Sequence, residues 1–304
     1  MAREKPASAA NERVYDRALA ERYWGHERLR LAEEFKIVLS AGEPRYVNAA
    51  YHHWETETLV RALGNARGVR VLDLACGLGR VSRVLAARGA KVVGVDNALA
   101  MLLAARQNLG RHRAKASLVQ GASNVLPFAD GAFRAVVCFG LLEHLPRALQ
   151  ETTLAEAFRV LAPGGALFLV VNNNHSLLLA SGEDNRFRRA EQLANGYFCG
   201  LVDRRQLTAA LARRGARVRA IGTNSHYSLL RHSLRGRVRD PRLEQECARA
   251  FEAAAERDLA EPAQGWLGEA CADHFVYRIE RPRGLAAKSA RARSSGAKRK
   301  FRAR

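Results

Sequence analysis

Long hydrophobic runs are missing from this chain of 304 residues, although 48% of its residues are hydrophobic. A membrane-spanning helix needs roughly 20 consecutive apolar residues, whereas the longest such run here, residues 166–171, has only the length of a strand. The first residues, MAREKPASAANER, are polar and charged and lack the apolar core of a secretory signal. We therefore expect a cytoplasmic protein with no membrane span.

Cysteines are also few, and their spacing follows no known framework. The chain has five, an odd number, and none belongs to a C-x-x-C pair: Cys76, Cys138, Cys199, Cys247 and Cys271. This pattern predicts neither a disulfide-linked scaffold nor a structural zinc site. We expect these side chains to act mainly as small buried residues.

Acidic residues are outnumbered, with 30 Asp and Glu against 50 Lys and Arg, and the formal net charge is +20. Residues 281–304 hold seven arginines, three lysines and no acid, so half of the net charge lies in this last segment. Such a composition cannot bury enough apolar area to order itself, and we expect a disordered basic tail. A solubilising extension and an arm that binds phosphate groups or a partner both stay open.

The order of the expected elements indicates an α/β fold. Residues 1–12 are expected to be disordered, and residues 13–66 to form a helical cap with helices at 14–40 and 46–63. From residue 69 onward, short apolar runs typical of buried strands alternate with helical stretches, which favours a parallel sheet with helices on both faces. We expect one domain over residues 67–280, with insertions at 173–200 and 223–272 that cover the ligand-binding edge.

A glycine-containing turn follows the first expected strand in the segment VLDLACGLGRVS, residues 71–82. Gly77 and Gly79 let a ligand approach the backbone, and a helix N-terminus follows them. A dinucleotide site has a third glycine or an alanine where this chain has Ser82, and Asp73 has the wrong sign to face a pyrophosphate. A ligand with an ammonium group, such as S-adenosylmethionine, fits this turn better.

A second acid ends the next expected strand, nineteen residues beyond Gly77. Asp96 can accept two hydrogen bonds from a ribose diol. An acid in this position can also be only the N-terminal cap of the following helix. Its spacing from the glycine turn favours the ribose contact.

At this point the chain clearly resembles the class I S-adenosylmethionine-dependent methyltransferases, in particular the small-molecule branch of ubiquinone and menaquinone C-methylases. The resemblance covers residues 69–171 through four motifs in order, which include VLDLACGLGR, KVVGVDNALAML and QGASNVLPFADGAFRAVVCFGLLEHL. It implies a Rossmann-like, mostly parallel seven-stranded sheet and S-adenosylmethionine as the cofactor. The residues that it places around the cofactor are Asp73, Ala75, Cys76, Gly77, Leu78, Gly79, Asp96, Asn97, Met101, Ala122, Ser123 and Phe139.

Three positions depart from the pattern of that family. Many members have glycine where this chain has Ala75, and an acid that accepts the adenine amino group where it has Ala122. Ser123 or a backbone carbonyl would have to replace that acid. Arg134 stands where an aspartate is usual, and we expect it to face solvent. The change at Ala122 keeps open a protein that binds the cofactor without transferring a methyl group.

The reaction implied by the resemblance is an in-line displacement, in which holding the two reactants in place provides most of the rate enhancement. A general base is optional, and His144 in LLEHL is the candidate, although it can equally be a packing residue. Further candidates for the acceptor pocket, each of which can also be a packing residue, are Tyr46, Tyr51, His52, His53, Trp54, His175 and Tyr197. Tyr23 weakly resembles a cofactor-covering tyrosine. Arg186, Arg188 and Arg189 could meet an acidic substrate.

The expected partner is a small-molecule acceptor that is methylated on oxygen, nitrogen or carbon. Methylation of RNA or protein is the alternative that the basic tail suggests. The Asn/Asp-Pro-Pro-aromatic motif of base-amine methylases is absent, because the corresponding place reads CFGLLEHL. Nucleic acid is therefore possible but not favoured, and the sequence indicates no metal.

Overall fold

A computed structural model describes residues 16–31, 33–180, 199–200, 202–234, 241–262 and 265–283. The expectations for residues 1–12, for most of the insertion at 173–200 and for most of the tail lie outside these ranges, as do Tyr197, Arg186, Arg188 and Arg189. None of the helices within the described ranges is both long enough and apolar enough to cross a bilayer.

Seven strands form one sheet in the order β3-β2-β1-β4-β5-β7-β6, which confirms the expected mostly parallel, seven-stranded architecture. Only β7 runs antiparallel to its neighbours, β5 and β6. The strands are β1 (Arg70–Leu74), β2 (Lys91–Asp96), β3 (Ala116–Gln120), β4 (Phe133–Cys138), β5 (Leu161–Asn172), β6 (Arg217–Thr223) and β7 (His274–Glu280). The carboxyl ends of β1, β2, β3, β4, β5 and β6 therefore share one edge of the sheet.

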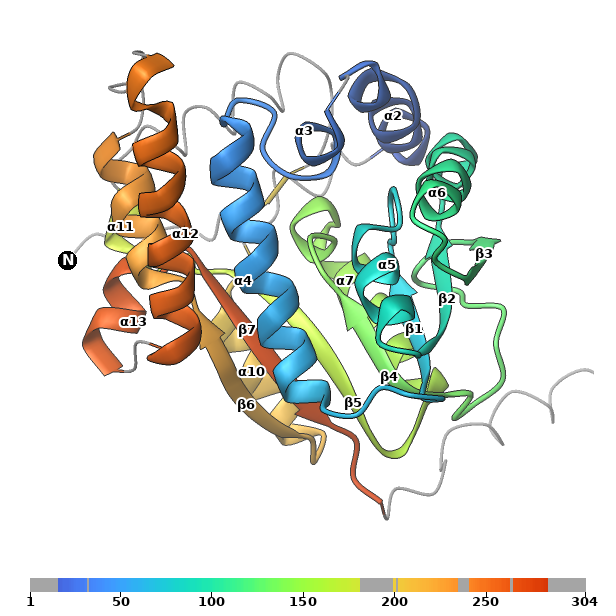
Figure 1. The fold of residues 1–304 in the computed structure, drawn as a ribbon. Coiled ribbons are helices and arrows are strands. Elements are labelled where there is room, and N and C mark those ends of the chain that lie inside the picture. Colours follow the sequence, from blue (N-terminus) through green and yellow to red (C-terminus); the bar gives the residue numbers. More distant parts are fainter. Residues whose placement is uncertain are drawn as a thin grey trace, which may run out of the picture.

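Helices pack on both faces of this sheet, as continuous apolar strands require (Figure 1). Those within the fold are α5 (Arg80–Ala87), α6 (Leu99–Arg111), α7 (Arg147–Val160), α8 (Leu177–Ala180), α10 (Arg204–Arg213), α11 (Ser225–Leu234), α12 (Glu244–Ala260) and α13 (Gly265–Cys271), with short turns η3 (Leu142–His144) and η4 (Pro241–Leu243). One apolar cluster joins a face of the sheet to α7 and α10, and a second joins the other face to α4 (Arg45–Leu63) and α12.

The N-terminal segment differs from the long helix expected over residues 14–40. It forms short pieces instead: α2 (Arg17–Arg22), the π-helical turn η1 (Tyr23–Glu27), η2 (Arg28–Arg30) and α3 (Glu34–Val38). The helix expected over residues 46–63 is confirmed as α4. In Figure 1 the short pieces lie above the carboxyl edge of β1 and β2, and α4 runs along the front of the sheet.

Candidate functional site

The turn between β1 and α5 has an unusual backbone. Ala75, Gly77 and Gly79 all have positive φ angles, of 60°, 52° and 72°. A left-handed conformation costs a residue with a Cβ roughly 1–2 kcal/mol, so Ala75 is strained at the position where the resembling family often has glycine. The strained turn bends the chain away from the end of β1 and opens the space above it.

Leu78 and Gly79 were expected to surround the cofactor, and in the structure both pack against other parts of the protein. A Cβ on Gly79 would lie 3.3 Å from Cγ of Leu109, and Leu78 is buried in a cluster with Ile37 and Met101. Neither residue lines the described cavities at this edge. The positive φ of Gly79 and its close approach to Leu109 on α6 both favour glycine at this position.

Asp73 lies in β1, is only 3% exposed, and faces the cavity above the turn. Oγ of Ser82 on α5 donates a hydrogen bond of 2.6 Å to its Oδ2. Burial raises the pKa of Asp73 to about 6, although the bond from Ser82 acts in the opposite direction. A cation placed beside this carboxylate would favour its ionised form, which is what the ammonium group of an amino-acid ligand would do.

Asp96 ends β2 and holds two turns together. Its Oδ2 accepts from the backbone N–H of Gly77 at 2.9 Å, and its Oδ1 accepts from the backbone N–H of Ala98 at 3.0 Å. Burial raises the pKa of this carboxyl as well, against these backbone bonds. Each carboxylate oxygen has two lone pairs, so Asp96 keeps acceptor capacity toward the cavities that it lines.

Two adjoining cavities lie above β1, β2 and β4 and share walls. The first, of about 100 Å³, brings together eight of the residues expected to surround the cofactor and His144: Asp73, Ala75, Cys76, Gly77, Asp96, Asn97, Met101, Phe139 and His144. The second, of about 160 Å³, is lined by Ala122 and Ser123 beside Gly121. Both cavities include Ala75, Asp96, Asn97 and His144 in their walls. Asp96 therefore lies where the two cavities adjoin, and Asp73 lies in the wall of the first.

The wall expected at the adenine end contains more polar groups than Ser123 alone. The hydroxyl of Ser123 is hydrogen-bonded to that of Thr153 at 2.9 Å. Asn124, which the sequence analysis passed over, also lines this cavity. Its amide can both donate and accept, and its position next to Ser123 is the only signal that would have pointed to it.

His144 lies in both cavity walls and packs against a residue that the sequence analysis missed. The ring of Trp24 meets the ring of His144 edge-on, with centroids 5.3 Å apart. Trp24 also lines both cavities, whereas its neighbour Tyr23 is buried and lines neither. The π-helical turn at this point changes which side chains face inward, so a helical spacing could not identify Trp24.

Arg28 holds the N-terminal segment over the site. Its guanidinium donates to the carbonyls of Lys36, Ile37 and Leu39 at distances of 2.5 to 2.8 Å, and it is almost fully buried. The same group lies 5.4 Å from the ring centroid of Trp24. These contacts join η2 to the end of α3, where Val38 lines the first cavity.

Arg80, the first residue of α5, connects the turn to the long helix α4. Its Nη1 lies 2.5 Å from Oε2 of Glu55 and 2.7 Å from Nδ1 of His52, and its side chain also lines the first cavity. Burial and the positive charge of Arg80 lower the pKa of His52 to about 2, so His52 is neutral near pH 7. A buried pair of this kind fixes the position of α4 relative to the turn.

Six of the residues proposed for an acceptor pocket lie in the described ranges, and none of them lines the two cavities: Tyr46, Tyr51, His52, His53, Trp54 and His175. Tyr46 packs on Phe251, and Tyr51 packs between Trp54, Tyr227 and His274. Nε2 of His53 meets Glu256 at 2.5 Å. Tyr46, Tyr51 and His53 therefore help to pack α4 against later parts of the chain.

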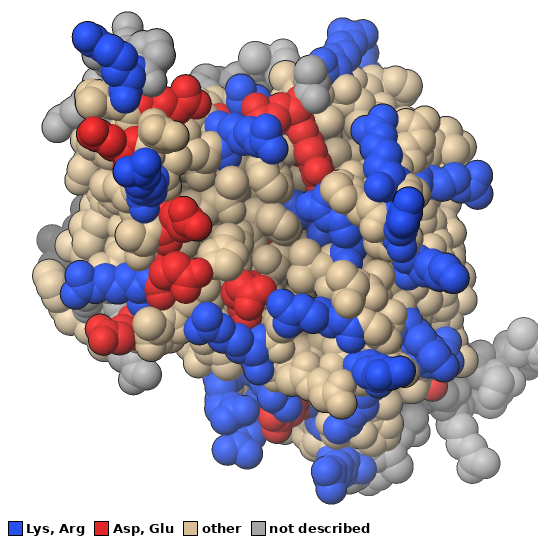
Figure 2. All heavy atoms as spheres, in the orientation of Figure 1, with Lys and Arg blue, Asp and Glu red and all other residues tan. Residues whose placement is uncertain are grey.

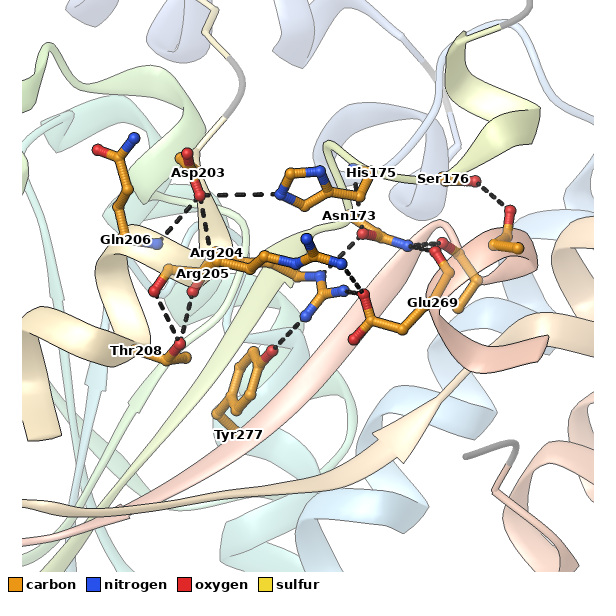
Figure 3. A network of polar contacts seen from close by, with 12 residues as sticks. Asn173, His175, Ser176, Asp203, Arg204, Arg205, Gln206, Thr208, Glu269 and Tyr277 are labelled. Atoms are coloured by element: carbon orange, nitrogen blue, oxygen red, sulfur yellow. Dashed lines mark hydrogen bonds and ion pairs between the residues drawn. The ribbon is translucent and has the colours of Figure 1, made fainter. Parts of the chain in front are cut away.

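The insertions after β5 and β6 meet at a polar network at the carboxyl end of β5 (Figure 3). Arg204, from α10, is buried and donates to Oδ1 of Asn173 at 2.8 Å and to Glu269 of α13, and it lies 4.1 Å from the ring centroid of Phe275. Nε2 of His175 lies 3.9 Å from Oδ1 of Asp203. The network fixes α10 and α13 beside the end of β5.

The two cavities lie at the carboxyl edge of a mostly parallel sheet, and two adjacent strands, β1 and β2, each carry an acid there. This arrangement is typical of α/β domains that bind a nucleotide-like ligand. Comparison with known proteins makes this class specific, because residues 71–165 match the family described as methyltransferase domain. This match covers the stretch in which the sequence motifs indicated the same family.

Two curated relatives show how far the similarity extends. A demethylmenaquinone methyltransferase of Parafrankia sp. (strain EAN1pec) is 40% identical over 147 residues, which are 43% of this chain and 54% of that protein. A 2-phytyl-1,4-naphtoquinone methyltransferase of Thermosynechococcus vestitus is 37% identical over 120 residues, which are 38% of this chain and 51% of that protein. The chain spans about half the length of the curated relatives it matches.

A solved structure supports the fold over a longer stretch. The magnesium protoporphyrin IX methyltransferase of Synechocystis PCC 6803, solved with bound SAH, superposes with a TM-score of 0.56. The superposition covers 88% of this chain and 100% of that chain at 17% sequence identity. This similarity shows a shared methyltransferase fold, including strands outside the matched family segment.

Proposed function

We propose that this protein transfers a methyl group from S-adenosylmethionine to a small-molecule acceptor. The observation that carries the proposal is the pair of buried acids, Asp73 and Asp96, on adjacent strands beside one strained turn. The match of residues 71–165 to a methyltransferase domain supports the same conclusion.

The described residues fit this cofactor from one end to the other. Because both acids line the first cavity, we assign Asp73 to the ammonium group of the methionine part and Asp96 to the ribose hydroxyls. We assign the wall of Ala122, Ser123 and Asn124 in the second cavity to the adenine. Bound S-adenosylmethionine supplies an electrophilic methyl group on a sulfonium sulfur.

The protein's own part in the reaction is to position and enclose the reactants. Phe139, Leu141 and His144 follow β4 and form the wall beside Asp73, and Trp24 covers this space from the N-terminal segment. Orientation of this kind contributes up to roughly 7–11 kcal/mol to an intramolecular displacement. His144, in the same wall, is the group placed to take a proton from an acceptor hydroxyl or acidic carbon.

We propose a quinone-like aromatic ring as the acceptor, because the two relatives described above are named for naphthoquinone substrates. The apolar and aromatic wall of Trp24, Val38 and Phe139 suits a flat ring. We propose that the chain is divided into a helical cap, a methyltransferase domain with covering insertions, and a basic tail. We also propose that the protein is cytoplasmic.

Calorimetric titration with S-adenosylmethionine tests the cofactor site. We expect Asp96→Asn to weaken binding at least tenfold, because a charge-assisted acceptor for the ribose is lost. Glu252→Gln, which removes an exposed carboxylate on α12, should bind like the wild type. Equal affinity of all three proteins would refute the site.

Incubation of the wild type with demethylated naphthoquinols and S-adenosylmethionine then tests the activity. The expected product is heavier than its acceptor by one methylene group, roughly 14 Da, on a mass spectrometer. Cofactor binding without any product from a broad panel of small acceptors would favour the alternative of a non-catalytic cofactor-binding protein.

Methylation of nucleic acid is less well supported by the structure. A cluster of five arginines lies at the amino edge of the sheet, away from the cavities. Strand β4 has six residues, and at ~3.3 Å per residue the two edges are roughly 20 Å apart. The basic groups are therefore not placed to present a base to the methyl group.

A further inference from the structure

The amino edge of the sheet carries a cleft of about 370 Å³ that the proposed methyl transfer does not use. Its walls hold five arginines and a single acid, together with two glycines and a proline: Arg134, Arg217, Arg278, Arg281, Arg283, Glu280, Gly164, Gly215 and Pro282. These residues come from the amino ends of β4, β5 and β6, from the end of β7, and from the segments next to β6 and β7. Figure 2 shows Lys and Arg side chains gathered around this lower end of the molecule.

Among the described residues, a single acid in the walls faces the five arginines of this cleft. Glu280 is shared by two arginines, since its Oε1 lies 3.1 Å from Nε of Arg278 and 3.6 Å from Nη2 of Arg219. Within the described residues, the side chains of Arg217 and Arg283 make no hydrogen bond or ion pair. Unpaired like charges in one cleft repel each other, and an anion bound between them would offset this cost.

Two further arginines hold the walls of the cleft in place. Nη1 of Arg281 donates to the carbonyls of Phe158, Arg159 and Leu161, and Nη1 of Arg134 donates to the carbonyl of Gly164. The side chain of Arg283 lies against Gly164, where a Cβ would be only 3.2 Å from it. The guanidinium groups of Arg217 and Arg283 therefore lie between walls that hydrogen bonds already hold in place.

We propose that this cleft binds the phosphate backbone of a nucleic acid strand, as a docking site separate from the methyl-transfer site. Every cation in its walls is an arginine, whose planar fork suits bidentate contact with phosphate oxygens. The sequence continues from Arg283 into residues 284–304, which add five arginines, three lysines and no acid. A strand carries a series of phosphates, so it can meet several arginines of the cleft at once.

An anionic membrane surface fits the cleft less well. A concave site suits a narrow strand better than a flat layer of headgroups, and the exposed large apolar residues in the described ranges all lie outside its walls. A bilayer at the amino edge would also leave the opening of the cofactor cavity facing away from the membrane. Membrane binding is therefore an outcome to be tested against the proposal.

Fluorescence anisotropy with a labelled 20-nucleotide single-stranded RNA tests the cleft in the full chain. We expect Arg217→Gln combined with Arg283→Gln to weaken binding at least tenfold at 50 mM NaCl. Loss of two phosphate contacts should also lower the slope of log K against log salt by about 1.4, at ~0.7 per contact for a single strand. The matched control, Arg106→Gln with Arg249→Gln, removes two exposed arginines from α6 and α12 and should change little.

Several results would overturn the proposal. They are wild-type affinity in the Arg217 and Arg283 variant, an equal loss in the control, or binding of phosphatidylglycerol vesicles but not RNA through these two arginines. S-adenosylmethionine affinity and the thermal melting curve, measured on the same variants, should match the wild type. Failure here therefore leaves the proposed methyl transfer untouched, and failure of the cofactor titration leaves this cleft untouched.

Discussion

The buried position of Asp73 changes the pKa of its carboxyl group. The carboxyl group has an ordinary pKa of 3.8, and burial raises it to about 6 in the folded protein. Between these values the folded state holds a proton that the unfolded state has lost. The contribution of Asp73 to stability therefore falls as the pH rises from about 4 to about 6, and it is unfavourable above that range.

Cofactor binding should show the opposite dependence on pH, because an ammonium group favours the ionised carboxylate. With a pKa of about 6, about a tenth of Asp73 is ionised at pH 5 and about nine tenths at pH 7. We expect the Kd for S-adenosylmethionine to be about tenfold higher at pH 5 than at pH 7. Calorimetry at the two pH values measures this difference.

Asp73→Asn is the control for that dependence. The amide cannot ionise, so affinity should be weak at both pH values and change much less between them, with only Asp96 and other groups contributing. A wild-type Kd that is the same at pH 5 and pH 7 would contradict the proposed contact between Asp73 and the ammonium group.

At the scale of elements, the N-terminal pieces act as a cover because Arg28 ties them together. Its hydrogen bonds to the carbonyls of Lys36, Ile37 and Leu39 hold α3 in the position where Val38 faces the cavity. Its contact with the ring of Trp24 holds η1 in place. Hydrogen bonds to a charged group contribute roughly 1.5–3 kcal/mol. Loss of this side chain should therefore affect both folding and binding.

We expect Arg28→Met to lower the free energy of unfolding by about 2–4 kcal/mol, because one buried and two partly buried carbonyls lose their donor. The Kd for S-adenosylmethionine should rise about fivefold, as Trp24 and Val38 lose their fixed positions. Urea denaturation and calorimetry measure the two effects. Arg30→Met, at an exposed position two residues away, is the matched control, and identical behaviour of both variants would exclude the clamp.

The elements also show why part of the site was predictable. The turn, Asp73 and Asp96 lie at the ends of strands whose apolar runs identify them, and parallel strands bring those ends to one edge. Trp24, Arg28 and Val38 were not predictable, because the helix expected over residues 14–40 is interrupted by a π-helical turn and a 3₁₀ turn. Hydrophobic spacing carries no signal for such interruptions.

At the scale of the whole molecule, Arg204 joins parts of the chain that lie far apart in sequence. It connects α10 to Asn173 after β5, to Glu269 in α13 and to the ring of Phe275 in β7 (Figure 3). The two insertions around the carboxyl edge, together with α10 and β7, are therefore joined through one buried guanidinium group.

We expect Arg204→Met to lower the free energy of unfolding by about 2–4 kcal/mol, because removing one member of a buried polar network leaves its partners unpaired. Urea denaturation measures this loss. Arg213→Met, on the exposed side of the same helix, should stay within about 0.5 kcal/mol of the wild type. A small loss for Arg204→Met would mean that the apolar contacts alone fix α10.

The sequence by itself determined the α/β sheet, the cofactor class and the two acids. These features depend on local periodicity, on turn chemistry and on one fixed spacing along the chain. Tertiary structure alone decided the cover over the site, the pairing of Arg80 with Glu55, the packing role of Gly79 and the arginine cleft. Each of these brings together side chains from distant segments, and the distance between them in space is set by packing, which no local pattern records.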